Sequence, residues 1–344
     1  MSNKSEILRL KSFISRHIIG QHKLVDRLLL ALLADGHLLV EGAPGLAKTR
    51  AVKVLGDGID ADFHRVQFTP DLLPADLTGT EIYRPQDASF QFQRGPLFHN
   101  LVLADEVNRA PAKVQSALLE AMAERQITVG RETYRLPQLY LVMATQNPIE
   151  QEGTYPLPEA QLDRFLLHVQ VTYPDAQEEQ DILALARQEA RQALGQELGQ
   201  ELGQEAGQEV GQEVGQKPGE AQAAPVTQEV IFAARNEALD TYMAENLQQY
   251  LIQLVLATRN PAVYGDDLAQ WLQYGGSPRA TIALDRCARV QAWLNDRDFV
   301  APEDVQAVVY DVLRHRLILN YEAEAEGVTT DQVIGALINR IAVP

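Results

Sequence analysis

The stretch Gly42-Ala43-Pro44-Gly45-Leu46-Ala47-Lys48-Thr49 follows an apolar run that ends at Glu41, and it precedes a segment with a helical pattern. A strand, a glycine-rich turn and a Lys-Thr pair at a helix start are typical of a phosphate-binding loop. Unpaired N–H groups and the positive dipole end of the helix favour phosphate oxygens there. In this layout Lys48 reaches the outer phosphates and the Thr49 hydroxyl holds Mg²⁺. The predicted binding positions are Gly42, Pro44, Gly45, Leu46, Ala47, Lys48 and Thr49.

Ala47 departs from the general loop pattern, which has Gly directly before the Lys. Because Ala adopts helical dihedrals readily, we expect Ala47 to have a negative φ, which would preserve the loop. The alternative is an ordinary Gly/Pro turn between a strand and a helix.

A second cluster, Leu101-Val102-Leu103-Ala104-Asp105-Glu106, is an apolar run that ends in two carboxylates. Such a run predicts a buried parallel strand, whose carboxyl end faces the ligand crevice. We expect Asp105 to hold the Mg²⁺ shell and Glu106 to orient and polarise the attacking water. The alternative is an acidic loop after a strand.

The composition narrows the class of protein. The chain has 344 residues, enough for two domains, and its 46% hydrophobic content supports a globular fold. A net charge of −17 argues against a surface that tracks nucleic acid. The single cysteine, Cys287, lies in an apolar helical stretch, which favours a packing role and a reducing compartment.

No apolar run has the length to span a bilayer, so no membrane insertion is expected and the predicted location is cytoplasmic. The histidines lack metal-ligand spacing, which leaves Mg²⁺ with the nucleotide as the only expected metal.

Helical patterns alternate with short apolar runs in the first half of the chain, which predicts a parallel sheet covered by helices. Two segments, 78–92 and 127–136, instead alternate around turn residues and are predicted hairpins. Expected strands cover residues 37–41, 64–69, 100–105, 140–146 and 168–173.

Residues 195–216 form a tetrapeptide array with Gly at every fourth position. Each Gly costs a helix roughly 1 kcal/mol relative to Ala, so a mostly disordered, weakly helical insertion is expected over 191–226. The predicted organisation is a nucleotide-binding core over 1–173, the start of a lid over 174–190, this insertion, and a helical lid over 227–344. Ser277-Pro278 is a predicted helix start within that lid.

Five motifs in order resemble those of the MoxR-type AAA+ ATPases, which belong to the helix-2-insert group. The resemblance covers nearly the whole chain apart from about 190–226, and the family commonly has Ala at the Ala47 position. Both predicted hairpins fall where the family carries its helix-2 insert and its pre-sensor hairpin. The motifs are Gly42–Thr49, Ala104-Asp105-Glu106-Val107-Asn108-Arg109-Ala110, Ala144-Thr145-Gln146-Asn147-Pro148, Leu157-Pro158-Glu159-Ala160-Gln161-Leu162-Asp163-Arg164-Phe165 and Ser277-Pro278-Arg279-Ala280.

The resemblance implies a P-loop AAA+ core with a five-stranded parallel sheet, followed by an all-helical lid. It further implies a homo-oligomeric ring, expected to be a hexamer, with nucleotide between core and lid and against the next subunit. Ile19, in the segment Ile18-Ile19-Gly20-Gln21, is similar to residues that line the adenine. The alternative for that segment is a plain turn between two helices.

The remaining roles follow from the same resemblance. Asn147 resembles the first sensor, which holds the attacking water together with Glu106. Arg164 resembles an arginine finger supplied to the neighbour's γ-phosphate, and Arg279 resembles the second sensor, which reaches the phosphates from the lid. Arg109 is either a second interfacial arginine or a partner in a local salt bridge.

The predicted function is a Mg-ATP-hydrolysing ring that remodels or activates a protein client, including assembly or metal-cofactor maturation of an enzyme complex. The resemblance adds a possible partner with a von Willebrand factor A domain. Three alternatives stay open: an ATP-dependent assembly scaffold with little turnover, a magnesium-chelatase-like motor, and a motor acting on nucleic acid.

Overall fold

Five short apolar runs form one parallel sheet in the computed structural model, which describes residues 2–148, 153–205 and 224–343. The strand order is β2-β5-β8-β1-β9, so the strand before the phosphate loop lies between β8 and β9. All five predicted strands are confirmed. They are β1 (Leu38–Glu41), β2 (Phe63–Gln67), β5 (Leu101–Asp105), β8 (Leu141–Gln146) and β9 (Leu167–Gln170).

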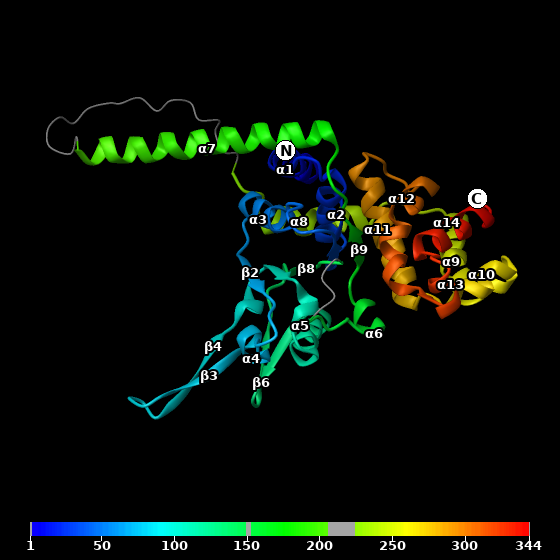
Figure 1. Ribbon diagram of the computed structural model, residues 1–344, viewed down its shortest axis with the longest axis horizontal. Coiled ribbons are helices and arrows are strands. Elements are labelled where there is room, and N and C mark those ends of the chain that lie inside the picture. Colours follow the sequence, from blue (N-terminus) through cyan, green and yellow to red (C-terminus); the bar gives the residue numbers. More distant parts are fainter. Residues whose placement is uncertain (1, 149–152, 206–223, 344) are drawn as a thin grey trace.

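Helices cover this sheet on both faces (Figure 1). The apolar stripes of the N-terminal segment form α1 and α2, and α3 begins at Lys48, directly after the glycine-rich turn. The helices of the core are α1 (Asn3–His17), α2 (His22–Leu33), α3 (Lys48–Gly58), α4 (Pro74–Thr78), α5 (Ala112–Glu124) and α6 (Glu159–Leu162), with the 3₁₀ turns η1 (Pro96–Phe98) and η2 (Val107–Arg109).

Two antiparallel hairpins extend from the core in the same general direction (Figure 1). The first pairs β3 (Gly79–Arg84) with β4 (Ser89–Arg94), and the second pairs β6 (Gln126–Val129) with β7 (Glu132–Arg135). Phe92 of the first stacks on Tyr134 of the second with ring centroids 4.1 Å apart. An aromatic contact therefore links the two hairpins.

The helix α7 (Ala176–Glu205) runs along one side of the molecule, near α1 and α3 (Figure 1). It crosses the predicted boundary at residue 190 and includes residues 191–205, the first part of the segment expected to be mostly disordered and weakly helical. Residues 206–223, which hold the rest of the tetrapeptide array, lie outside the described residues.

The C-terminal region is a bundle of helices with one small departure from the all-helical prediction. A two-stranded antiparallel pair joins β10 (Leu272–Tyr274) to β11 (Ile318–Leu319). Ser277 caps α11 by accepting a hydrogen bond from the backbone of Arg279, as the sequence predicts. The helices are α8 (Gln228–Leu239), α9 (Glu245–Arg259), α10 (Asp266–Trp271), α11 (Pro278–Leu294), α12 (Pro302–Leu313), α13 (Tyr321–Ala325) and α14 (Thr330–Arg340), with η3 (Pro261–Val263) and η4 (Arg314–Arg316).

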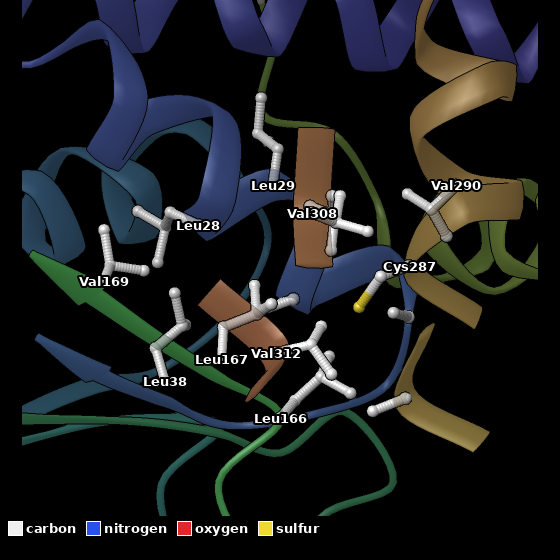
Figure 2. Close-up of a cluster of buried hydrophobic side chains, with 14 of the residues drawn as sticks. Leu28, Leu29, Leu38, Leu166, Leu167, Val169, Cys287, Val290, Val308 and Val312 are labelled. Carbon is white, nitrogen blue, oxygen red and sulfur yellow. The ribbon is translucent and has the colours of Figure 1, made fainter. Parts of the chain in front are cut away.

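One apolar core joins the sheet to the C-terminal helices (Figure 2). Leu38 of β1 and Leu167 of β9 belong to the same buried cluster as Val308 and Val312 of α12. Cys287 of α11 is fully buried in this cluster, and burial raises the pKa of its thiol to about 12. The two regions are therefore packed together rather than merely tethered.

Among the described residues, no helix combines the length and apolar character needed to cross a bilayer.

Candidate active site

The glycine-rich turn leaves the carboxyl end of β1 and leads directly into α3. Gly42 cannot be replaced without conflict, because a Cβ there would lie 2.8 Å from the carbonyl oxygen of Val171. Gly45 has a φ of +84° and open space around it. The turn thus has the close backbone approach and the left-handed residue that a phosphate-binding loop requires.

Ala47 also lies in the left-handed region, with φ 54° and ψ 15°, so the expected negative φ is wrong. It precedes the first residue of α3, where the chain must turn sharply from the loop into the helix. An L-residue in this region costs roughly 1–2 kcal/mol. The general pattern has Gly here because Gly avoids that cost.

The Lys48 side chain folds over the loop, with its Nζ donating to the Gly42 carbonyl at 2.5 Å. Burial lowers the pKa of this ammonium, while the nearby carboxylates of Asp105, Glu106 and Glu41 oppose the shift. Asp105 ends β5 and Glu106 directly follows it, so the lysine and the two predicted catalytic carboxylates share one electrostatic environment.

Asp105 is buried at the carboxyl end of β5 and holds two different partners. Its Oδ1 accepts a hydrogen bond from Thr145 Oγ1 at 2.6 Å. Its Oδ2 accepts from Arg65, at 3.0 Å from Nε and 2.6 Å from Nη2. The carboxylate is therefore fixed in orientation, with a cation from the neighbouring strand against one oxygen.

Glu106 follows in a left-handed conformation, with φ 56° and ψ 51°. The Thr145 hydroxyl stabilises this turn by accepting from the Glu106 backbone N–H at 2.9 Å. The Glu106 carboxylate accepts from Gln67 Nε2 at 2.7 Å and lies 3.0 Å from Arg109 Nε. Arg109 thus forms the local salt bridge that is one of its two predicted roles, and the interfacial role stays a prediction.

Asn147 directly follows β8, which lies between β5 and β1 in the sheet. It is 6% exposed. Its neighbour Gln146 accepts a hydrogen bond from the Gly42 backbone N–H at 3.3 Å, which places Asn147 beside the phosphate loop. The carboxyl ends of three adjacent strands thus bring Lys48, Glu106 and Asn147 to one edge of the sheet.

A cavity of about 260 Å³ adjoins the loop. Pro44, Gly45, Leu46 and Ala47 line one side of it, and Ile18 and Ile19 line another. The predicted adenine-lining segment and the phosphate loop therefore meet at one cavity. Gln21, also in the lining, donates to the Thr172 carbonyl at 3.1 Å and ties this segment to the chain after β9.

The third wall of the cavity comes from Tyr173, Pro174 and α7, whereas no described residue after 205 lines it. Of the predicted lid, only its first helix therefore lines this cavity, whereas the resemblance implies a nucleotide between the core and the whole lid. Arg50 of α3 and Glu189 of α7 form a bidentate ion pair that fastens this helix beside the cavity. The Arg50 guanidinium lowers the pKa of the Glu189 carboxyl.

Arg164 lies at the opposite edge of the sheet from Lys48. Strand β9 is parallel to β1, with Leu167 opposite Leu38 and Gln170 opposite Glu41. Arg164 precedes β9, whereas the phosphate loop follows β1, so at least the length of β1, about 10 Å, separates the two edges. Arg164 is half-buried, and its Nη1 donates to the Leu119 carbonyl of α5 at 2.7 Å.

Arg279, the second residue of α11, lies at this same edge. Its Nη1 lies 3.8 Å from Asp163 Oδ2, and Asp163 is the residue directly before Arg164. Ser277 Oγ donates to the same Asp163 oxygen at 2.8 Å. Arg279 is therefore not next to the loop of its own chain, as a sensor reaching phosphates from its own lid would be. The packing of the C-terminal helices against β9 is the physical reason.

The chemistry of the donor set fits a nucleoside triphosphate with Mg²⁺. The loop offers backbone N–H groups and an ammonium to phosphate oxygens, and Thr49 and Asp105 offer a hydroxyl and a carboxylate oxygen, the ligands Mg²⁺ prefers. The apolar walls formed by Ile18 and Ile19 fit the flat face of a base.

Three residues that contact the two acids of the site were not predicted from the sequence: Arg65, Gln67 and Thr145. A signal for the first two exists, since they alternate within a strand and residues i and i+2 share a face. Their role becomes visible only through the register that sets Gln67 opposite Asp105. Thr145 lies inside a quoted motif, but nothing in the sequence reveals that its hydroxyl bridges the two acids.

Comparison with known families gives two matches in this chain. Residues 37–167 match the family described as ATPase family associated with various cellular activities (AAA). Residues 268–337 match the AAA lid domain. The first match contains the loop, both acids, Asn147 and Arg164, and the second contains Arg279.

Several proteins are similar to nearly the whole of this chain, over most of their own length. Chaperone MoxR1 of Mycobacterium tuberculosis is 42% identical over 332 residues, which cover 96% of this chain and 80% of the relative. Protein MoxR of Paracoccus denitrificans is 33% identical over 346 residues, covering 95% of this chain and 93% of the relative. The crystal structure of a putative ATPase from Cytophaga hutchinsonii superposes with a TM-score of 0.83 at 43% identity, covering 99% of this chain and 96% of that one.

Proposed function

Because this chain belongs to the MoxR family of AAA+ ATPases, we propose that it hydrolyses Mg-ATP at sites shared between neighbouring copies of itself. One observation carries the proposal. The loop and the carboxylates of Asp105 and Glu106 meet at one edge of the sheet, while Arg164 and Arg279 meet at the other. Each subunit thus carries both kinds of half-site, and a complete site needs the loop half of one subunit and the arginine half of its neighbour.

The residues of the first half have separate tasks. Lys48 and the loop bind and orient the phosphates, and Glu106 accepts the proton of a water that Asn147 helps to place. Thr49 and Asp105 would hold Mg²⁺, which would supply electrostatic stabilisation of the negative charge that develops on the phosphate oxygens. Gln67, Arg109 and the Thr145 hydroxyl keep Glu106 in its left-handed conformation with its carboxylate oriented.

The second half belongs to the neighbour. Arg164 and Arg279 are offered to the γ-phosphate of the next subunit, where a finger of this type is worth roughly 10³–10⁵ in rate. Such head-to-tail contacts generate a closed ring when the rotation closes, and a homohexamer is the proposed assembly. This modifies the expected role of Arg279, which is proposed to act on the neighbour rather than on its own subunit.

The proposed biological role is a chaperone-like remodeller or activator of a protein client in the cytoplasm, with a von Willebrand factor A domain protein as its partner. A relative with 42% identity is named a chaperone, and this supports the role. The client is proposed to be an enzyme complex that requires assembly or metal-cofactor maturation. The two linked hairpins project from the core and expose Tyr83 and Phe90, which supports a contact with protein.

A mixing experiment tests the shared site. Lys48→Ala removes the phosphate ligand and keeps Arg164, whereas Arg164→Ala removes the finger and keeps Lys48. Each variant alone is expected to be inactive. In a random one-to-one mixture half of the sites carry Lys48 and half of these face Arg164, so the rate should recover to about a quarter of the wild-type rate. Two inactive variants that stay inactive when mixed would overturn the proposal, as would full activity of Arg164→Ala alone.

A further inference from the structure

Three consecutive residues of the C-terminal region, Arg314, His315 and Arg316, hold the backbone of the segment that carries Arg164. Arg314 Nη1 donates to the His168 carbonyl at 2.7 Å, and His315 Nε2 lies 3.0 Å from the Phe165 carbonyl. All three residues are buried, so water does not compete for these contacts. The short helix η4 is therefore attached to the core rather than only to its own domain.

Arg316 contacts the residues on both sides of Arg164. Its Nε donates to Asp163 Oδ1 at 2.8 Å, and its Nη2 donates to the Phe165 carbonyl at 2.6 Å. Its Nη1 donates to the Leu166 carbonyl at 3.2 Å. One planar guanidinium thus fixes the backbone before and after the finger, a task that suits the rigid fork of arginine.

The same carboxylate connects this segment to the start of α11. Asp163 Oδ1 is held by Arg316, while Asp163 Oδ2 accepts from Ser277 Oγ at 2.8 Å. Ser277 Oγ in turn accepts from the backbone N–H of Arg279 at 3.1 Å. Asp163 therefore connects the backbone that carries Arg164 to the backbone that carries Arg279.

Apolar side chains next to this polar cluster pack into the buried core. Val312, one turn before Arg316, and Leu166 belong to the buried cluster shared by the sheet and the C-terminal helices (Figure 2). A shift of η4 would consequently displace the segment before β9 as well.

We propose that Arg316 is a positioning residue for Arg164 and, through Asp163, for Arg279, so that the two arginines reach the neighbour's phosphates as one unit. This inference rests on the proposed function, because it assumes that these arginines act on a neighbouring subunit. Arg316 itself touches no substrate; its effect passes through the backbone on either side of Arg164 and through the Asp163 carboxylate.

The substitution Arg316→Lys tests this role, because it keeps the charge and removes the fork. A misplacement of about 1 Å at a catalytic group can cost roughly 10²-fold, so kcat is expected to fall by about that factor. The KM for ATP should change by less than about twofold, because the loop that binds ATP in the neighbouring subunit keeps all its residues and the finger acts mainly in the transition state. A lower kcat with an unchanged KM supports the proposal; an unchanged kcat overturns it.

Arg235→Lys is the matched control. Arg235 and Arg316 are both 8% exposed, and both connect the C-terminal region to the core. Arg235 donates to the Leu32 carbonyl at 2.8 Å and pairs with Asp35, away from the finger segment. Both variants should unfold at a lower temperature than the wild type, but only Arg316→Lys should lose turnover. An equal loss of kcat in both variants would show a merely structural role.

Mixing again separates the two proposals. Arg316→Lys keeps an intact Lys48 site. Mixing it with Lys48→Ala subunits should therefore restore ATPase activity, as mixing Arg164→Ala with Lys48→Ala does. Arg316→Lys mixed with Arg164→Ala should stay inactive, because neither supplies a placed finger. Failure of the Arg164→Ala and Lys48→Ala mixture rejects the shared site itself. Recovery in that mixture but not with Arg316→Lys rejects the positioning role alone. Asp163→Asn, which removes the charge that Arg316 and Ser277 contact, is the second variant should Arg316→Lys not fold.

Discussion

Both Nε and Nη2 of Arg65 donate to a single carboxylate oxygen of Asp105, at 3.0 and 2.6 Å. Asp105 is the proposed Mg²⁺-holding acid, and Arg65 comes from the adjacent strand β2. A guanidinium in this place occupies lone pairs of the carboxylate and repels a second cation. We therefore expect Mg²⁺ binding at Asp105 to compete with the Arg65–Asp105 contact.

Replacing Arg65 with Gln should lower the Mg²⁺ concentration that gives half-maximal ATPase activity. A like charge a few ångströms away in a largely hydrated site changes a binding constant by about fivefold. The measurement is a Mg²⁺ titration at saturating ATP. Arg84→Gln, on the exposed hairpin, removes the same charge far from Asp105 and should leave the titration unchanged. A higher Mg²⁺ requirement in Arg65→Gln would contradict the competition.

Glu106→Gln should bind ATP normally and lose roughly 10²–10⁴ in kcat, because the amide cannot accept the proton of the attacking water. Steady-state turnover and equilibrium binding of a fluorescent ATP analogue separate the two effects. The variant should also retain a bound client for isolation. Glu124→Gln, an exposed residue of α5, controls for the charge change. Normal turnover by Glu106→Gln would remove Glu106 from its role.

Glu189→Gln should accelerate nucleotide release, since the Arg50–Glu189 pair fastens α7 beside the cavity. Exposed ion pairs contribute up to about 1 kcal/mol, so the release rate should rise by no more than about fivefold. Displacement of a fluorescent ADP analogue in a stopped-flow instrument gives this rate. Asp267→Asn, which breaks the bidentate Arg340–Asp267 pair elsewhere, should leave it unchanged. Equal release rates in wild type and Glu189→Gln would show that the pair does not restrain α7.

Ala47→Gly should not destabilise the protein, although Ala-to-Gly substitutions in helices usually do. Relief of the left-handed strain, roughly 1–2 kcal/mol, offsets the greater entropy that Gly gives the unfolded chain. Ala123→Gly, at an exposed position inside α5, should cost about 1 kcal/mol. The two free energies of unfolding come from denaturant titrations. Equal losses in the two variants would contradict the strained conformation of Ala47.

Stability should fall as the pH is lowered from 7 to 5, partly because of His37. Burial, assisted by the Arg125 cation, lowers the pKa of this histidine from 6.5 to about 4. Its Nδ1 accepts from the Val142 N–H at 3.0 Å, a contact that protonation destroys. Since the folded pKa lies below the unfolded one, the contribution is present above pH 6.5 and is lost as the pH falls towards 4. About 2 kcal/mol should disappear between pH 7 and 5.

The control for this titration is His37→Gln, which does not ionise. The buried His315 also has a lowered pKa because of its burial, so the variant should still lose some stability in acid. The difference between the two proteins isolates His37. Identical pH dependence in wild type and His37→Gln would assign the loss to other groups.

Local sequence is sufficient for the first half of the site and insufficient for the second. The phosphate loop and the Asp105–Glu106 pair each come at the end of an apolar run, and parallel strands necessarily place these ends together. The φ of Ala47 could not be read from its residue type, because the turn geometry overrides its preference. The hidden contact between Arg316 and Asp163 joins residues 153 positions apart. It depends on where the C-terminal helices pack, which motifs do not encode.

The opposite placement of Lys48 and Arg164 across one sheet constrains how such a chain can change over evolutionary time. In the proposed ring the surface beside Lys48 must fit the surface beside Arg164 of an identical molecule. A substitution that reshapes either edge appears in every subunit at once, so it alters each junction of the assembly simultaneously. Drift at one edge therefore selects for a compensating change at the other, and two diverged copies of the gene would soon cease to assemble together.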